Sequence, residues 1–97
     1  MSYEIRLTPE AESDLRNIYD YIRAQTSDDL ARAYVGRLLE FLARFDEFPE
    51  RGTLRDDIRP GLRIVGFERR VSIPFVVEHD QVIVLRVLYA GRDLKLP

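Results

Sequence analysis

Residues 70–89 read RVSIPFVVEHDQVIVLRVLY, two mostly apolar runs separated by a short polar break. The runs 70–78 and 82–89 carry the period-2 alternation that is typical of strands, and His79-Asp80 between them predicts a hairpin turn. One face of this hairpin should be buried. We expect the core face to carry Val71, Ile73, Phe75 and Val77 from the first run and Ile83, Leu85, Val87 and Tyr89 from the second.

Pro74 interrupts the first run, because proline has no N–H group to donate to a sheet. It predicts either a bulge at this point or an amide position that faces away from a neighbouring strand. A third strand, 62–67 (LRIVGF), precedes this pair. It follows the loop 49–61, whose Arg51-Gly52 and Pro60-Gly61 pairs are turn signals.

The first half of the chain predicts one strand and two helices. Tyr3, Ile5 and Leu7 alternate with polar residues, and Thr8-Pro9 then supplies a cap and a first helical residue for a helix that runs to about residue 23. Thr26 or Ser27 caps a second helix, which ends before Pro49. Its apolar face is expected to carry Leu30, Tyr34, Leu38, Phe41, Leu42 and Phe45.

The element order is therefore β-α-α-β-β-β, and the fold class is α+β, with a helical hairpin packed on one face of a mostly antiparallel sheet. The 97 residues are expected to form one domain, 1–97. There is no cysteine and only one histidine, so neither a disulfide nor a thiolate metal site is expected. Without an apolar signal run or membrane span, we expect a cytoplasmic protein.

Charge is distributed unevenly along the chain. Residues 1–50 carry a balance of −5 and residues 51–97 a balance of +3, and fourteen of the fifteen cations are arginine. The second half therefore favours a mildly basic face, and the polar positions of the expected sheet, Arg63, Arg70, Ser72 and Arg86, would form it. This face is too weakly charged to predict nucleic-acid binding by itself.

Three segments together resemble the ParE/RelE superfamily of toxins from type II toxin–antitoxin pairs. They are LTPEAESDLRNIYDYI (7–22), AYVGRLLEFLARFDEFPERG (33–52) and GLRIVGFERRVSIPFVVEHDQVIVLRVLYAGRD (61–93). The most specific combination is the helix opening with Ala11, Asp14, Leu15 and Ile18, followed by residues 48–52 and 86–93. The resemblance covers nearly the whole chain in the order of the family.

The resemblance implies one of two activities. ParE-like members inhibit DNA gyrase by binding it, whereas RelE-like members cleave mRNA on the ribosome. If the chain is RelE-like, the catalytic residues implied are Arg70, Arg86, Tyr89 and Arg92. RNA cleavage needs a base, an acid and cations that neutralise the phosphate.

The residues favour the ParE-like reading, in which the protein is no enzyme and uses no metal or cofactor. Ser72 stands where RelE-like strands carry an arginine, and a hydroxyl cannot neutralise a phosphate. Tyr89 continues an apolar face, so packing is favoured over acid catalysis, and His79 reads as a solvated turn residue. Asp56-Asp57 reads as a capping or solvated loop pair.

A ParE-like toxin implies two protein partners: DNA gyrase and a cognate antitoxin, ParD-like and expected to be a ribbon-helix-helix DNA binder. An antitoxin could lay a helix on the αα-hairpin and add a strand to a sheet edge. The Tyr19, Tyr21 and Tyr34 group could be either core edge or the wall of a docking groove. The expected antitoxin contacts are Tyr19, Ile22, Tyr34, Leu38, Arg63, Arg70 and Arg86.

Overall fold

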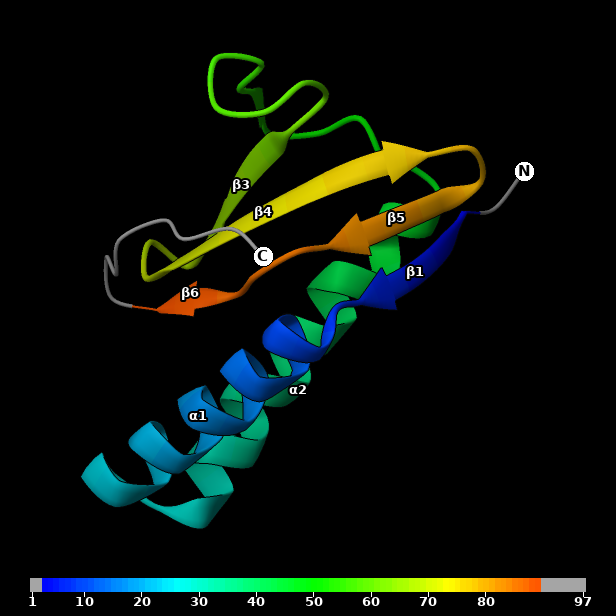
Figure 1. The fold of residues 1–97 in the computed structure, drawn as a ribbon. Helices are drawn as coiled ribbons and strands as arrows, with labels where there is room; N and C mark the ends of the chain where they lie inside the picture. Colours follow the sequence, from blue (N-terminus) through cyan, green and yellow to red (C-terminus); the bar gives the residue numbers. More distant parts are fainter. Residues whose placement is uncertain (1–2, 90–97) are drawn as a thin grey trace.

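The computed structural model describes residues 3–89, which form two helices on one face of a six-stranded mixed sheet (Figure 1). The helices are α1 (Pro9–Gln25) and α2 (Asp28–Ala43), and a 3-10 turn, η1 (Arg44–Asp46), follows α2. The strands are β1 (Glu4–Leu7), β2 (Thr53–Leu54), β3 (Arg63–Phe67), β4 (Val71–Glu78), β5 (Gln81–Val84) and β6 (Leu88–Tyr89).

The sheet has the order β1-β5-β4-β3-β2, and β6 pairs with β4 beyond the end of β5. Every pairing is antiparallel except that of β1 with β5. The predicted α+β class and the β-α-α-β-β-β order are confirmed. Two details differ: β2 was not predicted, and the predicted last strand is divided into β5 and β6.

Side-chain caps begin both helices. Thr8 Oγ1 accepts from the Ala11 N–H at 3.0 Å, and Pro9 occupies the first turn, where no intrahelical donor is needed. Of the two residues predicted to cap the second helix, Ser27 is the one that does so, accepting from the Leu30 N–H at 3.2 Å. The two-residue link between the helices forces them into an antiparallel hairpin.

The main core lies between this hairpin and the sheet. It joins helix residues such as Ile18 and Leu38 to strand residues such as Ile73 and Val84. A second cluster around Phe45, Phe75 and Val82 extends the core under β4 and β5. The predicted apolar face is thus buried or partly buried, except at Leu30. Leu30 is 58% exposed because it lies in the first turn of α2, next to the link that joins the two helices.

A bulge divides the last strand. Phe75 pairs with Val84 and Ser72 pairs with Leu88, so the two residues between them on β4 face three residues, 85–87, on the partner segment. The Leu85 N–H donates to the Pro74 carbonyl at 2.9 Å, which places the donorless nitrogen of Pro74 on the same side. Of the two alternatives predicted at Pro74, the bulge is the one found. Its extra residue lies on the partner segment opposite Pro74, where no N–H from the proline is needed.

The bulge corrects the predicted core face of residues 82–89. Before it, Val82 and Val84 are buried in the core, while Ile83 and Leu85 belong to a cluster on the opposite face of the sheet. After it, Val87 is in the main core and Tyr89 packs against it. The expectation that Ile83, Leu85, Val87 and Tyr89 share one face was wrong, because one extra residue inverts a period-2 pattern.

The sheet face turned away from the helices is largely apolar. Leu62, Val76 and Leu85 are each at most 5% exposed and pack with Ile64 and Ile83. Strand register places Ser72 on this face and Arg63, which pairs with Phe75, on the helix side. The predicted basic face with Arg63, Arg70, Ser72 and Arg86 is therefore not one face.

Candidate functional site

The two most specific pieces of the sequence signature meet inside the fold. Asp14 of α1 is 4% exposed, and its carboxylate accepts two hydrogen bonds from the Arg86 guanidinium, at 2.7 and 2.9 Å. The same carboxylate accepts the Val87 N–H at 2.9 Å. Asp14 thereby accepts hydrogen bonds from both the backbone and a side chain of the bulge. Its carboxylate also raises the pKa of Arg86.

A second bond ties the start of α1 to the same bulge. The Thr8 hydroxyl, besides capping the helix, donates to the Leu85 carbonyl at 2.7 Å. Residues 85–87, which form the bulge, are therefore held by the N-cap side chain of α1 and by Asp14 within α1. The Arg86 side chain is turned to α1 rather than to a surface that could meet a substrate, which the sequence alone did not reveal.

A groove of about 410 Å³ opens between the free end of the helical hairpin, the β3–β4 turn and β6. We call it the tyrosine groove. Its wall consists of Tyr21, Ile22, Gln25, Thr26, Leu30, Tyr34, Arg37, Arg70 and Tyr89. Three of the predicted antitoxin contacts, Ile22, Tyr34 and Arg70, come together here, and so do two of the four residues implied by a RelE-like activity, Arg70 and Tyr89.

Three tyrosine rings form one side of this groove. The Tyr89 ring centroid lies 5.6 Å from that of Tyr21 and 6.1 Å from that of Tyr34, and the second pair is edge-to-face. Tyr21 is 53% exposed, whereas Tyr34 is 9% exposed. The sequence left two roles possible for Tyr19, Tyr21 and Tyr34: the edge of the core or the wall of a groove. Tyr34 has both roles, Tyr21 lies at the rim of the groove, and Tyr19 lies outside it.

The Tyr34 hydroxyl is a buried polar group with no hydrogen-bond partner among residues 3–89. Burial is the main reason why the pKa of Tyr34 is raised, so the hydroxyl stays protonated at neutral pH and can donate. Leaving a buried donor unpaired costs about 1–3 kcal/mol. Structures retain such a group where something else satisfies it or where it has a role.

Two arginines approach the groove from different elements. The Arg37 guanidinium lies 5.3 Å from the Tyr34 ring centroid and makes two bonds, of 2.9 and 3.1 Å, to Glu68. Its charge is therefore largely countered. Arg70 is exposed and has no ion pair with any of the described residues, so its charge is available to an incoming group.

The β3–β4 turn that carries Glu68 and Arg70 has an unusual backbone. Glu68 and Arg69 both have positive φ, 48° and 62°, and the Arg70 N–H closes the turn onto the Phe67 carbonyl at 3.2 Å. Non-glycine residues pay about 1–2 kcal/mol for this conformation. In this conformation the turn places Glu68 against Arg37 and Arg70 at the tyrosine groove.

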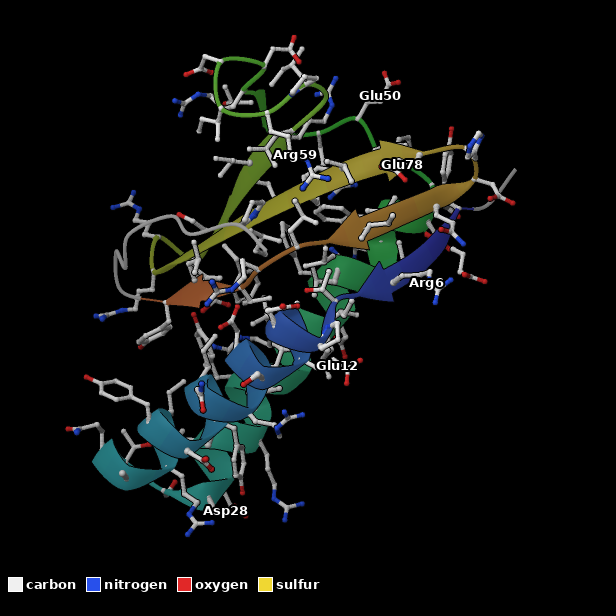
Figure 2. The ribbon with its side chains drawn as sticks, viewed as in Figure 1. Arg6, Glu12, Asp28, Glu50, Arg59 and Glu78 are labelled. Carbon is white, nitrogen blue, oxygen red and sulfur yellow. The ribbon has the colours of Figure 1, made fainter. Side chains whose placement is uncertain are left out.

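A second groove, of about 360 Å³, runs along the outer side of the helical hairpin. We call it the hairpin groove. It is almost entirely apolar at its surface and is lined by Leu15, Arg16, Tyr19, Asp20, Val35 and Leu39. Tyr19, one of the predicted antitoxin contacts, lies here and donates its hydroxyl to Asp28, which Figure 2 shows at the end of the hairpin farthest from the sheet.

The remaining predicted residues are scattered. Leu38 is fully buried in the core, so it offers no surface to a partner in this conformation. Arg63 is half-buried on β3, away from both grooves. Arg92 lies outside the described residues. His79 forms the exposed β4–β5 turn with φ of 54°, as predicted.

Asp56 and Asp57 both serve the loop before β3, in line with the prediction. Asp56 accepts the Gly61 N–H at 2.8 Å, and Arg55 holds Asp57 at 2.9 Å, which lowers the pKa of Asp57. Within residues 3–89 no cluster of acidic or histidine side chains has a metal-binding arrangement. None of the described helices has the length and apolar character needed to cross a membrane.

Comparison with known proteins gives a consistent result. The family model described as the ParE toxin of the type II toxin–antitoxin system parDE matches residues 5–94. A structure titled as the chromosomal ParDE system from P. aeruginosa is 25% identical, with a TM-score of 0.80, covering 93% of this chain and 98% of its own.

The structure of the RelBE2 toxin–antitoxin complex from Mycobacterium tuberculosis is 20% identical with a TM-score of 0.67, and 92% of each chain is covered. At this identity the likeness concerns the fold alone. None of the curated sequences compared with the chain matches it.

Proposed function

Because the chain belongs to the ParE toxin family of type II toxin–antitoxin systems, we propose that it inhibits DNA gyrase by binding and that a cognate antitoxin neutralises it. The proposal involves no hydrolytic step, metal or cofactor. It places the protein in the cytoplasm, where a gyrase inhibitor meets its target.

The composition of the outer sheet face is the observation that carries the non-enzymatic proposal. Among the described strand residues whose register places them on this face, Arg6 at the edge is the one cation, and the centre is the apolar cluster around Val76. The loop before β3 adds Arg59, which Figure 2 shows in front of β4. A phosphorane needs several cations around it. Arg86, another of the residues implied by a RelE-like activity, is bonded to Asp14 instead, so among residues 3–89 no acid, base and cation set converges on the centre of this face.

A ribosome-dependent mRNA endonuclease remains the alternative function. Arg70 and Tyr89 do share the tyrosine groove, and a tyrosine can act as a general acid. This pair lacks a partner base among the residues that line the groove, which is why we favour gyrase binding.

We assign the antitoxin to the hairpin groove, as a partner that presents an amphipathic helix. The groove offers apolar side chains at helical spacing on both helices, and Leu39 in it is 46% exposed. Helix-in-groove recognition uses this type of surface. Tyr19 and the charged pair Arg16 and Asp20 at the rim would orient the helix.

The test is a supercoiling and cleavage assay with purified gyrase, run beside a translation assay that detects cleavage of ribosome-bound mRNA. We expect loss of supercoiling with intact mRNA, and recovery when antitoxin is added. Cut mRNA with normal supercoiling would refute the gyrase proposal, above all if Tyr89→Phe abolishes the cutting.

Antitoxin placement has a separate test. Leu39→Asp is expected to weaken the antitoxin complex, because it places a charge in an apolar groove. The matched control is Ile58→Asp, which changes an apolar side chain of similar exposure (40%) in the loop before β3. Equal affinities for both variants would exclude the hairpin groove as the antitoxin site.

A further inference from the structure

The tyrosine groove has a combination of features that an apolar protein-docking surface does not need. It brings together three aromatic rings and one guanidinium, that of Arg70, which has no ion pair among the described residues. We propose that this groove binds a nucleoside monophosphate, with the base against the tyrosine rings and the phosphate on Arg70.

The aromatic side of the groove suits a nucleobase. Tyr21 and Tyr89 stand 5.6 Å apart at an interplanar angle of 55°, and Tyr21 at the rim leaves half of its surface open. Every base has a π-face that stacks on an aromatic ring, so such a platform accepts different bases. Ile22 and Leu30 add apolar surface beside the rings, while Gln25 and Thr26 can bond the polar edge of a base.

The opposite side of the groove suits a phosphate. Arg70 comes from the β3–β4 turn, whose left-handed residues direct Glu68 to Arg37 and leave Arg70 on the groove. A planar guanidinium pairs bidentately with phosphate oxygens. Arg37, already bonded to Glu68, contributes a second, weaker positive charge.

Tyr34 forms the inner side of the groove. Its ring stands edge-to-face with the Tyr89 ring, and its hydroxyl is shielded from solvent, so a bound ligand packs against the ring and makes no bond to the hydroxyl. The groove volume of about 410 Å³ is at the small end of the range of small-molecule sites, about 300–1,000 Å³.

The ligand could be a free nucleotide or the terminal nucleotide of a single strand, because both present the same base and phosphate. Isothermal titration calorimetry of the full chain with adenosine 5′-monophosphate up to about 1 mM tests the site. Adenosine tests the base without the anion, and ribose 5-phosphate tests the anion without the base. A 5′-phosphorylated trinucleotide distinguishes the two sources, since tighter binding than the monophosphate indicates a strand end.

Matched variants locate the binding. Arg70→Gln is expected to raise the dissociation constant of the monophosphate about tenfold, because a charged hydrogen bond is lost. Arg69→Gln, the same change in the neighbouring residue outside the groove, should leave it unchanged. Tyr21→Ala is expected to weaken binding about tenfold, while Tyr21→Phe, which keeps the ring, should preserve it.

Three results would overturn the proposal. One is the absence of any heat of binding for the monophosphate and the trinucleotide. If an acidic peptide binds the groove instead, its ligand is a protein partner. Another is equal affinity for ribose 5-phosphate and the monophosphate. The third is equal weakening by the Arg69 and Arg70 substitutions. None of these depends on gyrase, so the site can fail while the toxin function stands.

Discussion

Asparagine in place of Asp14 is expected to lower the free energy of unfolding by about 3 kcal/mol. The carboxylate is 4% exposed and accepts three hydrogen bonds, two from Arg86 and one from the Val87 N–H. Asparagine can still accept the backbone bond, but its amide group offers a donor to a guanidinium that has only donors. The Arg86 guanidinium, whose side chain is 20% exposed, loses its carboxylate acceptor, and breaking such an ion pair at a mostly buried site costs about 3–5 kcal/mol.

The companion variant, Arg86→Met, leaves the Asp14 carboxylate buried with only its backbone donor, and a loss of similar size is expected. In the double variant neither charge remains. Its loss should therefore be smaller than the sum of the two single losses by about 2 kcal/mol or more, which is the coupling of residues in contact.

Urea unfolding followed by far-UV circular dichroism measures all four proteins, and an unchanged m-value would show that the native state is comparable. A loss of about 3 kcal/mol corresponds to a fall of about 12–24 °C in Tm for a domain of this size. Asp57→Asn is the matched control, because it removes the same charge from an exposed two-bond pair with Arg55 and should cost much less. A loss below about 1 kcal/mol for Asp14→Asn, or additive single losses, would refute the reasoning.

Four further substitutions test backbone conformation, a buried hydroxyl and titration. Gly52→Ala should lower the free energy of unfolding, measured in urea, by about 1–3 kcal/mol, because φ is +77° and a Cβ would lie 2.4 Å from the Ile64 carbonyl oxygen in β3. Gly36→Ala should raise it by about 0.5–1 kcal/mol, because Gly36 lies within α2 and a Cβ there meets open space. Tyr34→Phe should raise stability by about 1 kcal/mol at neutral pH, since an unpaired hydroxyl disappears. The raised pKa of Tyr34 means that native stability falls as pH rises above 10, and the same variant should flatten this decline in thermal melts; an unchanged decline would contradict it. The Arg37 guanidinium lowers the pKa of Glu68, so this pair contributes stability above pH 4.5 that is lost as pH falls below it, and Arg37→Gln should show a shallower acid loss.

Local patterns predicted most of the fold. The Thr8-Pro9 helix start, the Ser27 cap and the His79-Asp80 turn depend on neighbours in sequence, and all three are confirmed. The strand β2 is not predictable from the sequence, because it has only two residues and so is too short to show an alternating apolar pattern. Leu30 was misplaced because a helical repeat does not reveal where the covering sheet ends.

The candidate site was predictable only in part. Three of the predicted antitoxin contacts, Ile22, Tyr34 and Arg70, do line one groove. Two others, Leu38 and Arg86, are engaged within the fold, and for Leu38 the prediction of a core position is the one confirmed. The register inversion at the bulge arises from one extra residue, and the sequence shows only the proline opposite it. The contact between Asp14 and Arg86 joins two motifs that no local pattern links.

The parallel pairing of β1 with β5 has a consequence for the order in which the chain becomes functional. The partner of Thr8 in the bulge lies 77 residues downstream. At synthesis rates of about 5–20 residues per second, this partner is made about 4–15 s after Thr8. The helical hairpin can form early, but its apolar face stays uncovered until the last strands are synthesised. During this interval the helix of the proposed antitoxin could bind the incompletely folded chain.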